Sequence, residues 1–140
     1  MTCSILRDTK GMRNVLNPLN SKSVFVVEDA PPIRERLTAM LRESDGVEVI
    51  GEADNPQSAI QGILSKKPDS VVLDIQLIGG SGLEVLEAVH PIHPQIVFII
   101  LTNFPSKQYR QKCLVSGASY FLDKNDEFLK VLDAVHNHLH

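Results

Sequence analysis

Residues 70–83 read Ser70-Val71-Val72-Leu73-Asp74-Ile75-Gln76-Leu77-Ile78-Gly79-Gly80-Ser81-Gly82-Leu83. The apolar run at the start is continuous rather than alternating, which is typical of a strand buried on both faces of a parallel sheet. Asp74 falls where this run gives way to glycines, at the carboxyl end of the strand, and open α/β sheets bind their ligands outside those ends. An aspartate at this place can also simply cap the next turn, so the rest of the chain must decide between the two interpretations.

The composition favours one globular domain. A chain of 140 residues that is 43% hydrophobic is long enough to bury a hydrophobic core, and it is too short to form two domains of ordinary size. The net charge of −3 comes without any block of like charges, so we expect no direct contact with nucleic acid and none with a membrane. Cys3 and Cys113 lack metal-ligand spacing, and the chain has neither a signal peptide nor a long apolar run. We therefore expect a reduced, cytoplasmic protein.

Residues 1–21 show no clear period, and we expect a flexible N-terminal leader there, ahead of one domain over 22–140. Apolar runs in this domain predict strands at 24–27, 47–50, 70–73, 96–101 and 119–122. Helical periodicity and capping signals predict helices that begin at Pro31 and Pro56, helices over 82–89 and 105–116, and a last helix that Asn125 caps, with Asp126 and Glu127 in its first turn. Alternating strands and helices predict an α/β fold with a doubly wound five-stranded parallel sheet and helices on both faces.

Polar side chains follow four of these strands where each strand ends. They are Glu28 and Asp29, Asp74, Thr102, and Lys124. The carboxyl ends of parallel strands meet at one edge of a sheet, so we expect the five side chains to lie close together. Each one alone has an ordinary structural explanation, such as a solvated lysine or a polar strand end. A merely solvated face gives no reason for all of them to fall at strand ends.

The short segments around these positions resemble the receiver domains of two-component response regulators, over about residues 21–140. The matching segments are Val-Val-Glu-Asp at 26–29, Val-Val-Leu-Asp-Ile at 71–75, Gly-Gly-Ser-Gly-Leu at 79–83, Ile-Leu-Thr at 100–102 and Gly-Ala-Ser-Tyr-Phe-Leu-Asp-Lys at 117–124. Each segment is weak evidence alone, but five in the right order are specific. The resemblance implies a flavodoxin-like sheet with strand order 2-1-3-4-5.

The residues also suggest the chemistry of this edge. Clustered carboxylates repel one another and favour a hard cation such as Mg²⁺, and a carboxylate is a competent nucleophile for phosphoryl transfer. The resemblance implies that Asp74 accepts the phosphoryl group and ligates Mg²⁺ together with Asp29 and the carbonyl of Gln76, while Glu28 acts through water. It further implies that Lys124 and Thr102 contact phosphoryl oxygens.

In this family the same chemistry works as a switch. The resemblance implies that phosphorylation pulls Thr102 inward and lets Phe121 turn in behind it, which alters the surface of the fourth helix, fifth strand and fifth helix of the domain. Here that surface includes Tyr109, Arg110, Tyr120 and Asp123. The implied phosphodonor is a sensor histidine kinase or a histidine phosphotransfer protein, and the surface would bind a target protein or a second copy of the chain.

Several positions depart from the common pattern of the family. Ile78 stands where proline is frequent, Asn103 where a small residue is usual, Phe121 where tyrosine is more common, and Asn125 where proline is frequent. Asn103 could narrow access for small phosphodonors. We also hypothesise that Phe104 shields the acyl-phosphate from water and prolongs the phosphorylated state.

Two alternatives stay open from the sequence. The chain could be a scaffold that acts without phosphorylation, or the receiver part of a DNA-binding regulator whose output domain is absent. A true hydrolase of the haloacid dehalogenase type is disfavoured, because Gln76 stands where a second acid is needed. We therefore expect no enzyme beyond Mg²⁺-dependent self-phosphorylation and autodephosphorylation of Asp74.

Overall fold

The computed structural model describes residues 21–103 and 105–137. The five long strands are β1 (Lys22–Val27), β2 (Val47–Ala53), β3 (Ser70–Leu73), β6 (Val97–Thr102) and β7 (Tyr120–Asp123). The helices are α2 (Pro31–Arg42), α3 (Pro56–Lys66), α4 (Gly82–Val89), α5 (Lys107–Val115) and α6 (Lys130–Asn137). Two short strands, β4 (Gln76–Leu77) and β5 (Gly80–Ser81), pair with each other.

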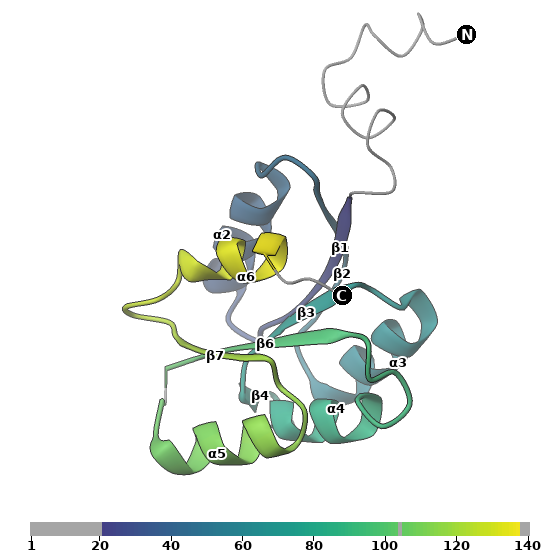
Figure 1. Cartoon of the computed structure of the whole chain (residues 1–140), viewed down its shortest axis with the longest axis vertical. Coiled ribbons are helices and arrows are strands. Elements are labelled where there is room, and N and C mark those ends of the chain that lie inside the picture. Colours follow the sequence, from purple (N-terminus) through teal and green to yellow (C-terminus); the bar gives the residue numbers. More distant parts are fainter. Residues whose placement is uncertain (1–20, 104, 138–140) are drawn as a thin grey trace, which may run out of the picture.

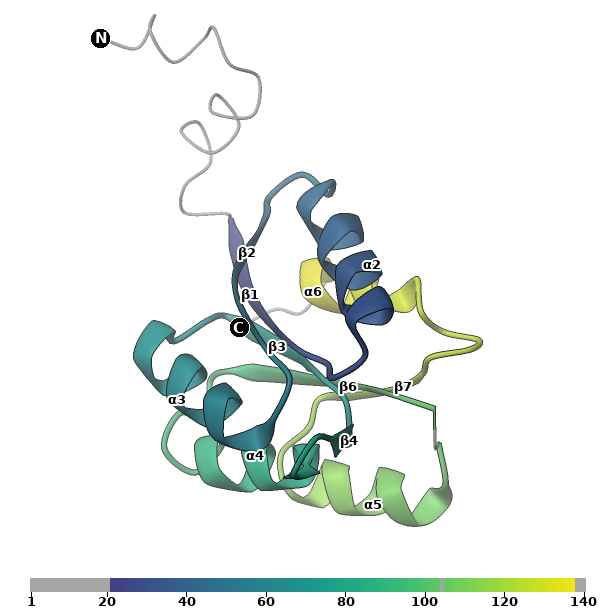
Figure 2. The same cartoon turned by 180° about the vertical axis from the view of Figure 1, so that it is seen from behind.

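The five long strands form one parallel sheet in the order β2-β1-β3-β6-β7. Counting only these strands along the chain, the order is 2-1-3-4-5, which confirms the predicted flavodoxin-like topology. Figures 1 and 2 show α2 and α6 on one face of the sheet and α3, α4 and α5 on the other. The doubly wound arrangement with helices on both faces is therefore confirmed.

Alternate residues of each strand supply the two cores. On β1, Phe25 and Val27 join the cluster that includes Ile63 of α3 and Leu86 of α4. Val24 and Val26 join the cluster on the opposite face, with residues of α2 and α6 such as Leu37, Leu41, Val131 and Val135. Because successive strand residues point to opposite faces, a strand covered on both sides must be apolar throughout. This explains why β1, β3 and β6 carry continuous apolar runs.

Local signals place several element boundaries correctly, whereas β2, predicted over 47–50, extends to Ala53. Helix α3 begins at Pro56 as predicted, and the side chain of Asn55 accepts a hydrogen bond from the amide of Ser58 over 2.9 Å. Helix α5 begins two residues later than predicted, at Lys107, because Ser106 caps it by accepting a hydrogen bond from the amide of Tyr109. Gly117, at φ +117°, follows this helix in a conformation that favours glycine.

The predicted start of the last helix is wrong. Helix α6 begins at Lys130, and residues 125–129 form turns in place of a first helical turn that Asn125 would cap. The Asp123 carboxylate accepts from the amide of Asn125 over 2.8 Å, and the Glu127 carboxylate accepts from the amide of Asp123 over 2.9 Å. These side chain to backbone bonds compete with helical hydrogen bonds and hold the segment in a loop.

Two sequence predictions lie outside the described residues: nearly all of the leader over 1–21, and the shielding role of Phe104. Among the helices that the structure does describe, none is both long and apolar enough to cross a membrane.

Candidate functional site

The carboxyl edge of the sheet gathers the predicted polar residues. Backbone hydrogen bonds continue the strand pairing for one residue beyond the strand ends: the amide of Asp74 donates to the carbonyl of Val27 over 3.0 Å, and the amide of Lys124 donates to the carbonyl of Thr102 over 2.9 Å. Asp74 and Lys124 are therefore each held by a neighbouring strand. This explains how residues far apart in the sequence come to share one site.

Lys124 links two of the acids. Its Nζ lies 2.6 Å from Oε1 of Glu28 and 2.9 Å from Oδ2 of Asp74. All three side chains are buried, with Glu28 only 1% exposed. A buried charge is expensive unless it is paired, and here the Lys124 ammonium lies between two carboxylates.

Burial and pairing have opposite effects on the pKa values of Glu28 and Lys124. Burial is the largest influence on Glu28 and raises the pKa of its carboxyl, although hydrogen bonds from Lys124 and from the amide of Ala30 oppose it. Burial also acts most strongly on Lys124, where it favours the neutral amine, but the hydrogen bonds to Glu28 and Asp74 outweigh it and raise the pKa of Lys124. Lys124 is therefore a fixed cation at neutral pH.

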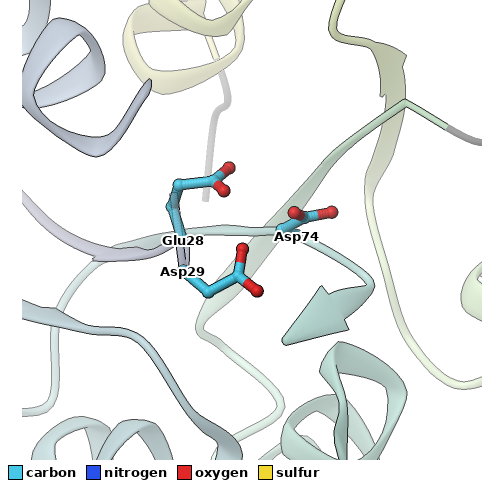
Figure 3. Close-up of side chains that lie close together, drawn as sticks. All are labelled: Glu28, Asp29 and Asp74. Carbon is cyan, nitrogen blue, oxygen red and sulfur yellow. The ribbon is translucent and has the colours of Figure 1, made fainter. Parts of the chain in front are cut away.

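Three carboxylates lie close enough to share one cation. One oxygen each from Glu28, Asp29 and Asp74 falls within 4.8 Å of the others. Figure 3 shows Glu28 and Asp29 extending from the chain after β1 to the side of Asp74. Carboxylate oxygens are ligands that Mg²⁺ prefers, so the residues of this acidic cluster fit a site for that ion.

The loop after Asp74 has a structure that the sequence analysis missed. Strands β4 and β5 pair as a short antiparallel hairpin, and the amide of Gln76 donates to Oδ1 of Asp74 over 3.4 Å. A side chain on Gly82 would collide with the carbonyl oxygen of Asp74, so the chain packs back on itself here. Ser81 and Glu84 form a capping box at the start of α4, and their spacing was the available sequence signal.

A groove of about 420 Å³ borders the acidic cluster. It is lined by Asp29, Ile75, Gln76, Leu77, Gly80, Ser81 and Tyr109. The hairpin of β4 and β5 forms one wall of the groove, and Tyr109 of α5 forms part of another. The groove reaches the acidic cluster through Asp29, and Asp74 is not among the residues that line it.

The two predicted switch residues lie on one face of the sheet. Ile100 is opposite Phe121, and Thr102 is opposite Asp123, which places Thr102 and Phe121 diagonally across β6 and β7. Thr102 is fully buried, and Phe121 is 7% exposed. Arg110 of α5 places its guanidinium carbon 6.0 Å from the centre of the Phe121 ring. The structure thus brings the pair together and connects it to α5, while the switching itself stays a prediction.

Comparison with known proteins supports the assignment that the fold and the edge residues suggest. The family model described as the response regulator receiver domain matches residues 24–136. The fold and the acidic edge define a receiver-like signalling domain, and the chain belongs to the response regulator receiver domain family.

Individual relatives place this domain in longer proteins. The chain is 29% identical over 112 residues to the response regulator GacA of Pseudomonas syringae pv. syringae, covering 80% of this chain and 52% of GacA. It is 34% identical over 106 residues to a protein-glutamate methylesterase/protein-glutamine glutaminase of Clostridium acetobutylicum, covering 74% of this chain and 31% of that protein. The chain thus spans about half the length of GacA and about a third of the length of the methylesterase.

A solved structure of similar fold is the DNA-binding response regulator of the LuxR family from Staphylococcus aureus. The TM-score is 0.74 at 28% identity, and the match covers 83% of this chain and 99% of that chain. The DNA-binding character of that protein stands partly against our expectation that this chain makes no direct contact with nucleic acid. Relatives as different as a DNA-binding regulator and a methylesterase show that the family alone does not fix the output.

Proposed function

We propose that this chain acts in a two-component phosphorelay, in which Asp74 accepts a phosphoryl group from a sensor histidine kinase or a histidine phosphotransfer protein. The observation that carries the proposal is the Lys124 ammonium, held 2.6 Å from Glu28 and 2.9 Å from Asp74 beside a third acid, Asp29. This arrangement supplies a nucleophile and a fixed positive charge at one place. Phosphoryl transfer depends mostly on such positioning and charge neutralisation.

In the proposed step, a carboxylate oxygen of Asp74 attacks the phosphorus atom of a phosphohistidine. The new P–O bond forms as the P–N bond breaks, and the imidazole nitrogen leaves with the electron pair of that bond. Lys124 and Thr102 would then contact the oxygens of the phosphoryl group. Mg²⁺ bound by Asp29, Asp74 and the carbonyl of Gln76, with Glu28 acting through water, would neutralise charge on those oxygens.

The phosphoryl group would then act on the switch pair. A hydrogen bond from the Thr102 hydroxyl to a phosphoryl oxygen would favour one packing of Thr102 against Phe121, which shifts the balance between two existing states. The affected surface would be that of α5, β7 and α6, including Tyr109, Arg110, Tyr120 and Asp123. Its partner would be a target protein or a second copy of the chain.

We further propose that the domain spans 22–140, acts in the cytoplasm, and catalyses nothing beyond its own phosphorylation and dephosphorylation. Membership in the receiver family and the acidic cluster support a phosphoacceptor role. A scaffold that works without phosphorylation is the second candidate. The DNA-binding relative from Staphylococcus aureus favours a third, in which the chain is the receiver part of a transcription regulator.

The test is the intact mass of the chain after incubation with acetyl phosphate, with and without Mg²⁺. We expect a phosphoryl mass increment that requires Mg²⁺ and disappears in Asp74→Asn. Asp133→Asn is the matched control, because Asp133 is an exposed acid on α6. An increment that persists in Asp74→Asn would refute the assignment of Asp74, and no increment with either acetyl phosphate or a cognate kinase would favour the scaffold.

A further inference from the structure

Arg34, in the first half of α2, contacts the backbone of Glu28 but is not itself one of the three carboxylates of the acidic cluster. Its Nη1 donates a hydrogen bond of 2.7 Å to the backbone carbonyl of Glu28, and its Nε lies 3.4 Å from Oε1 of Glu52 on β2. We propose that Arg34 is a positioning residue that fixes the peptide between Glu28 and Asp29 and thereby sets the affinity of the acidic cluster for Mg²⁺. This inference rests on the proposed function, because it takes Mg²⁺ as the ion of that cluster.

The geometry of the peptide explains why this contact matters. The Glu28 carboxylate is already held, since Oε1 lies 2.6 Å from Lys124 Nζ and Oε2 accepts from the amide of Ala30 over 3.1 Å. The carbonyl of Glu28 lies in the same rigid plane as the nitrogen and Cα of Asp29. By fixing that carbonyl, Arg34 therefore fixes the direction in which Asp29 leaves the end of β1.

The chemistry of arginine suits this role. Its planar guanidinium can bind two acceptors in fixed directions at once, whereas a lysine ammonium is a single point of charge on a flexible stem. Here the two acceptors are a backbone carbonyl at the acidic edge and Glu52 on the neighbouring strand. The side chain of Arg34 is only 21% exposed, and its hydrogen bond to the carbonyl is charge-assisted and short.

A simple charge effect predicts the opposite result. Arg34 is a cation near three carboxylates, so by Coulomb's law alone its removal would relieve repulsion and strengthen Mg²⁺ binding. Loss of positioning would weaken binding instead, because the Asp29 carboxylate would lose its fixed direction. The sign of the change in affinity therefore separates the two explanations.

Arg42 provides the matched control. Its Nη2 lies 3.6 Å from Oε2 of the same Glu52, and its side chain is 55% exposed. Within the described part of the chain, the Glu28 carbonyl receives its arginine hydrogen bond from Arg34 and not from Arg42. Arg42→Ala thus removes a cation and one contact to Glu52, while the hydrogen bond from Arg34 to the Glu28 carbonyl stays in place.

The experiment measures Mg²⁺ dissociation constants by titration calorimetry on the full chain and on Arg34→Ala, Arg34→Lys and Arg42→Ala. We expect about tenfold weaker binding for Arg34→Ala, at the low end of the effect of residues that orient metal ligands. Arg34→Lys should lose less, and Arg42→Ala should stay within about twofold of the native chain because its cation is exposed to solvent. With acetyl phosphate, Arg34→Ala should need more Mg²⁺ but reach the native rate once Mg²⁺ saturates.

Thermal unfolding without Mg²⁺ shows whether each variant is folded. Mg²⁺ binding to Arg34→Ala that is as tight as in the native chain, or tighter, would overturn the inference. If Arg34→Ala does not fold, Arg34→Lys decides, and an unchanged affinity in that variant counts against the inference equally. A native chain that binds Mg²⁺ but is never phosphorylated would refute the proposed function while leaving the role of Arg34 measurable, and a native chain that binds no Mg²⁺ would overturn both.

Discussion

Helices α4 and α5 lie on the same face of the sheet, but they are attached to it very differently. Helix α4 buries four of its eight residues: Gly82, Val85, Leu86 and Val89. Helix α5 buries only Cys113 among its nine, and leaves Tyr109, Leu114 and Val115 exposed. An element with few buried contacts opens and shifts at low free energy. The fold therefore buries more of the helix that follows the Asp74 loop than of α5, which lies on the proposed responsive surface.

Truncating one buried and one exposed leucine is the strongest test of this difference. Leu86→Ala should lower the free energy of unfolding by about 3 kcal/mol, because it removes a fully buried side chain of α4 and leaves a cavity. Leu114→Ala on α5 should cost less than about 1 kcal/mol, since Leu114 is 39% exposed. Urea denaturation of both variants measures the two values, and similar losses would remove the contrast between the helices.

Cys113, the one buried residue of α5, predicts a dependence of stability on pH. Burial raises the pKa of the Cys113 thiol from 9.0 to about 11, so the folded state favours the neutral thiol. The stability that the neutral thiol contributes is fully present below about pH 9 and is lost as the pH rises through 11, by at most about 3 kcal/mol in total. Measured against Cys113→Ala, in a Cys3→Ser background, the advantage of the native residue should shrink between pH 9 and pH 11.

A difference that stays constant over this interval of pH would mean that the Cys113 thiolate reaches water without unfolding. Helix α5 would then be even more loosely held than its one buried side chain indicates.

The caps of the two helices give the smallest expected effects. The Ser81 hydroxyl accepts from the amide of Leu83 over 3.1 Å, and Ser81→Ala should cost about 1 kcal/mol, as is usual for a lost cap. Ser106 caps α5 by accepting from the amide of Tyr109 over 3.2 Å, but Ser106→Ala should cost only a few tenths of a kcal/mol globally because α5 contributes little to the core. Equal losses in urea denaturation would show that α5 unfolds together with the rest of the domain.

The sequence predicted most of the fold and the members of the candidate site. Strand ends placed Asp74, Thr102 and Lys124 at one edge, and the structure brings these residues together there. No sequence signal indicated the pairing of β4 with β5, because strands of two residues are too short to show a periodicity. The predicted start of the last helix was too early. Asp123 and Glu127 make side chain to backbone hydrogen bonds within the loop, and these bonds cannot be foreseen from the sequence pattern.

By itself the sequence determined the alternation of strands and helices, the two-sided burial of the sheet and the identity of the edge residues. These follow from local periodicity and capping, which act over a few neighbouring positions. Only the tertiary structure decided that Lys124 bridges Glu28 and Asp74, that α5 buries Cys113 alone among its residues, and that Arg34 binds the carbonyl of Glu28. Such contacts depend on how separate elements pack against one another and on backbone atoms that every residue shares, so no pattern of residue types records them.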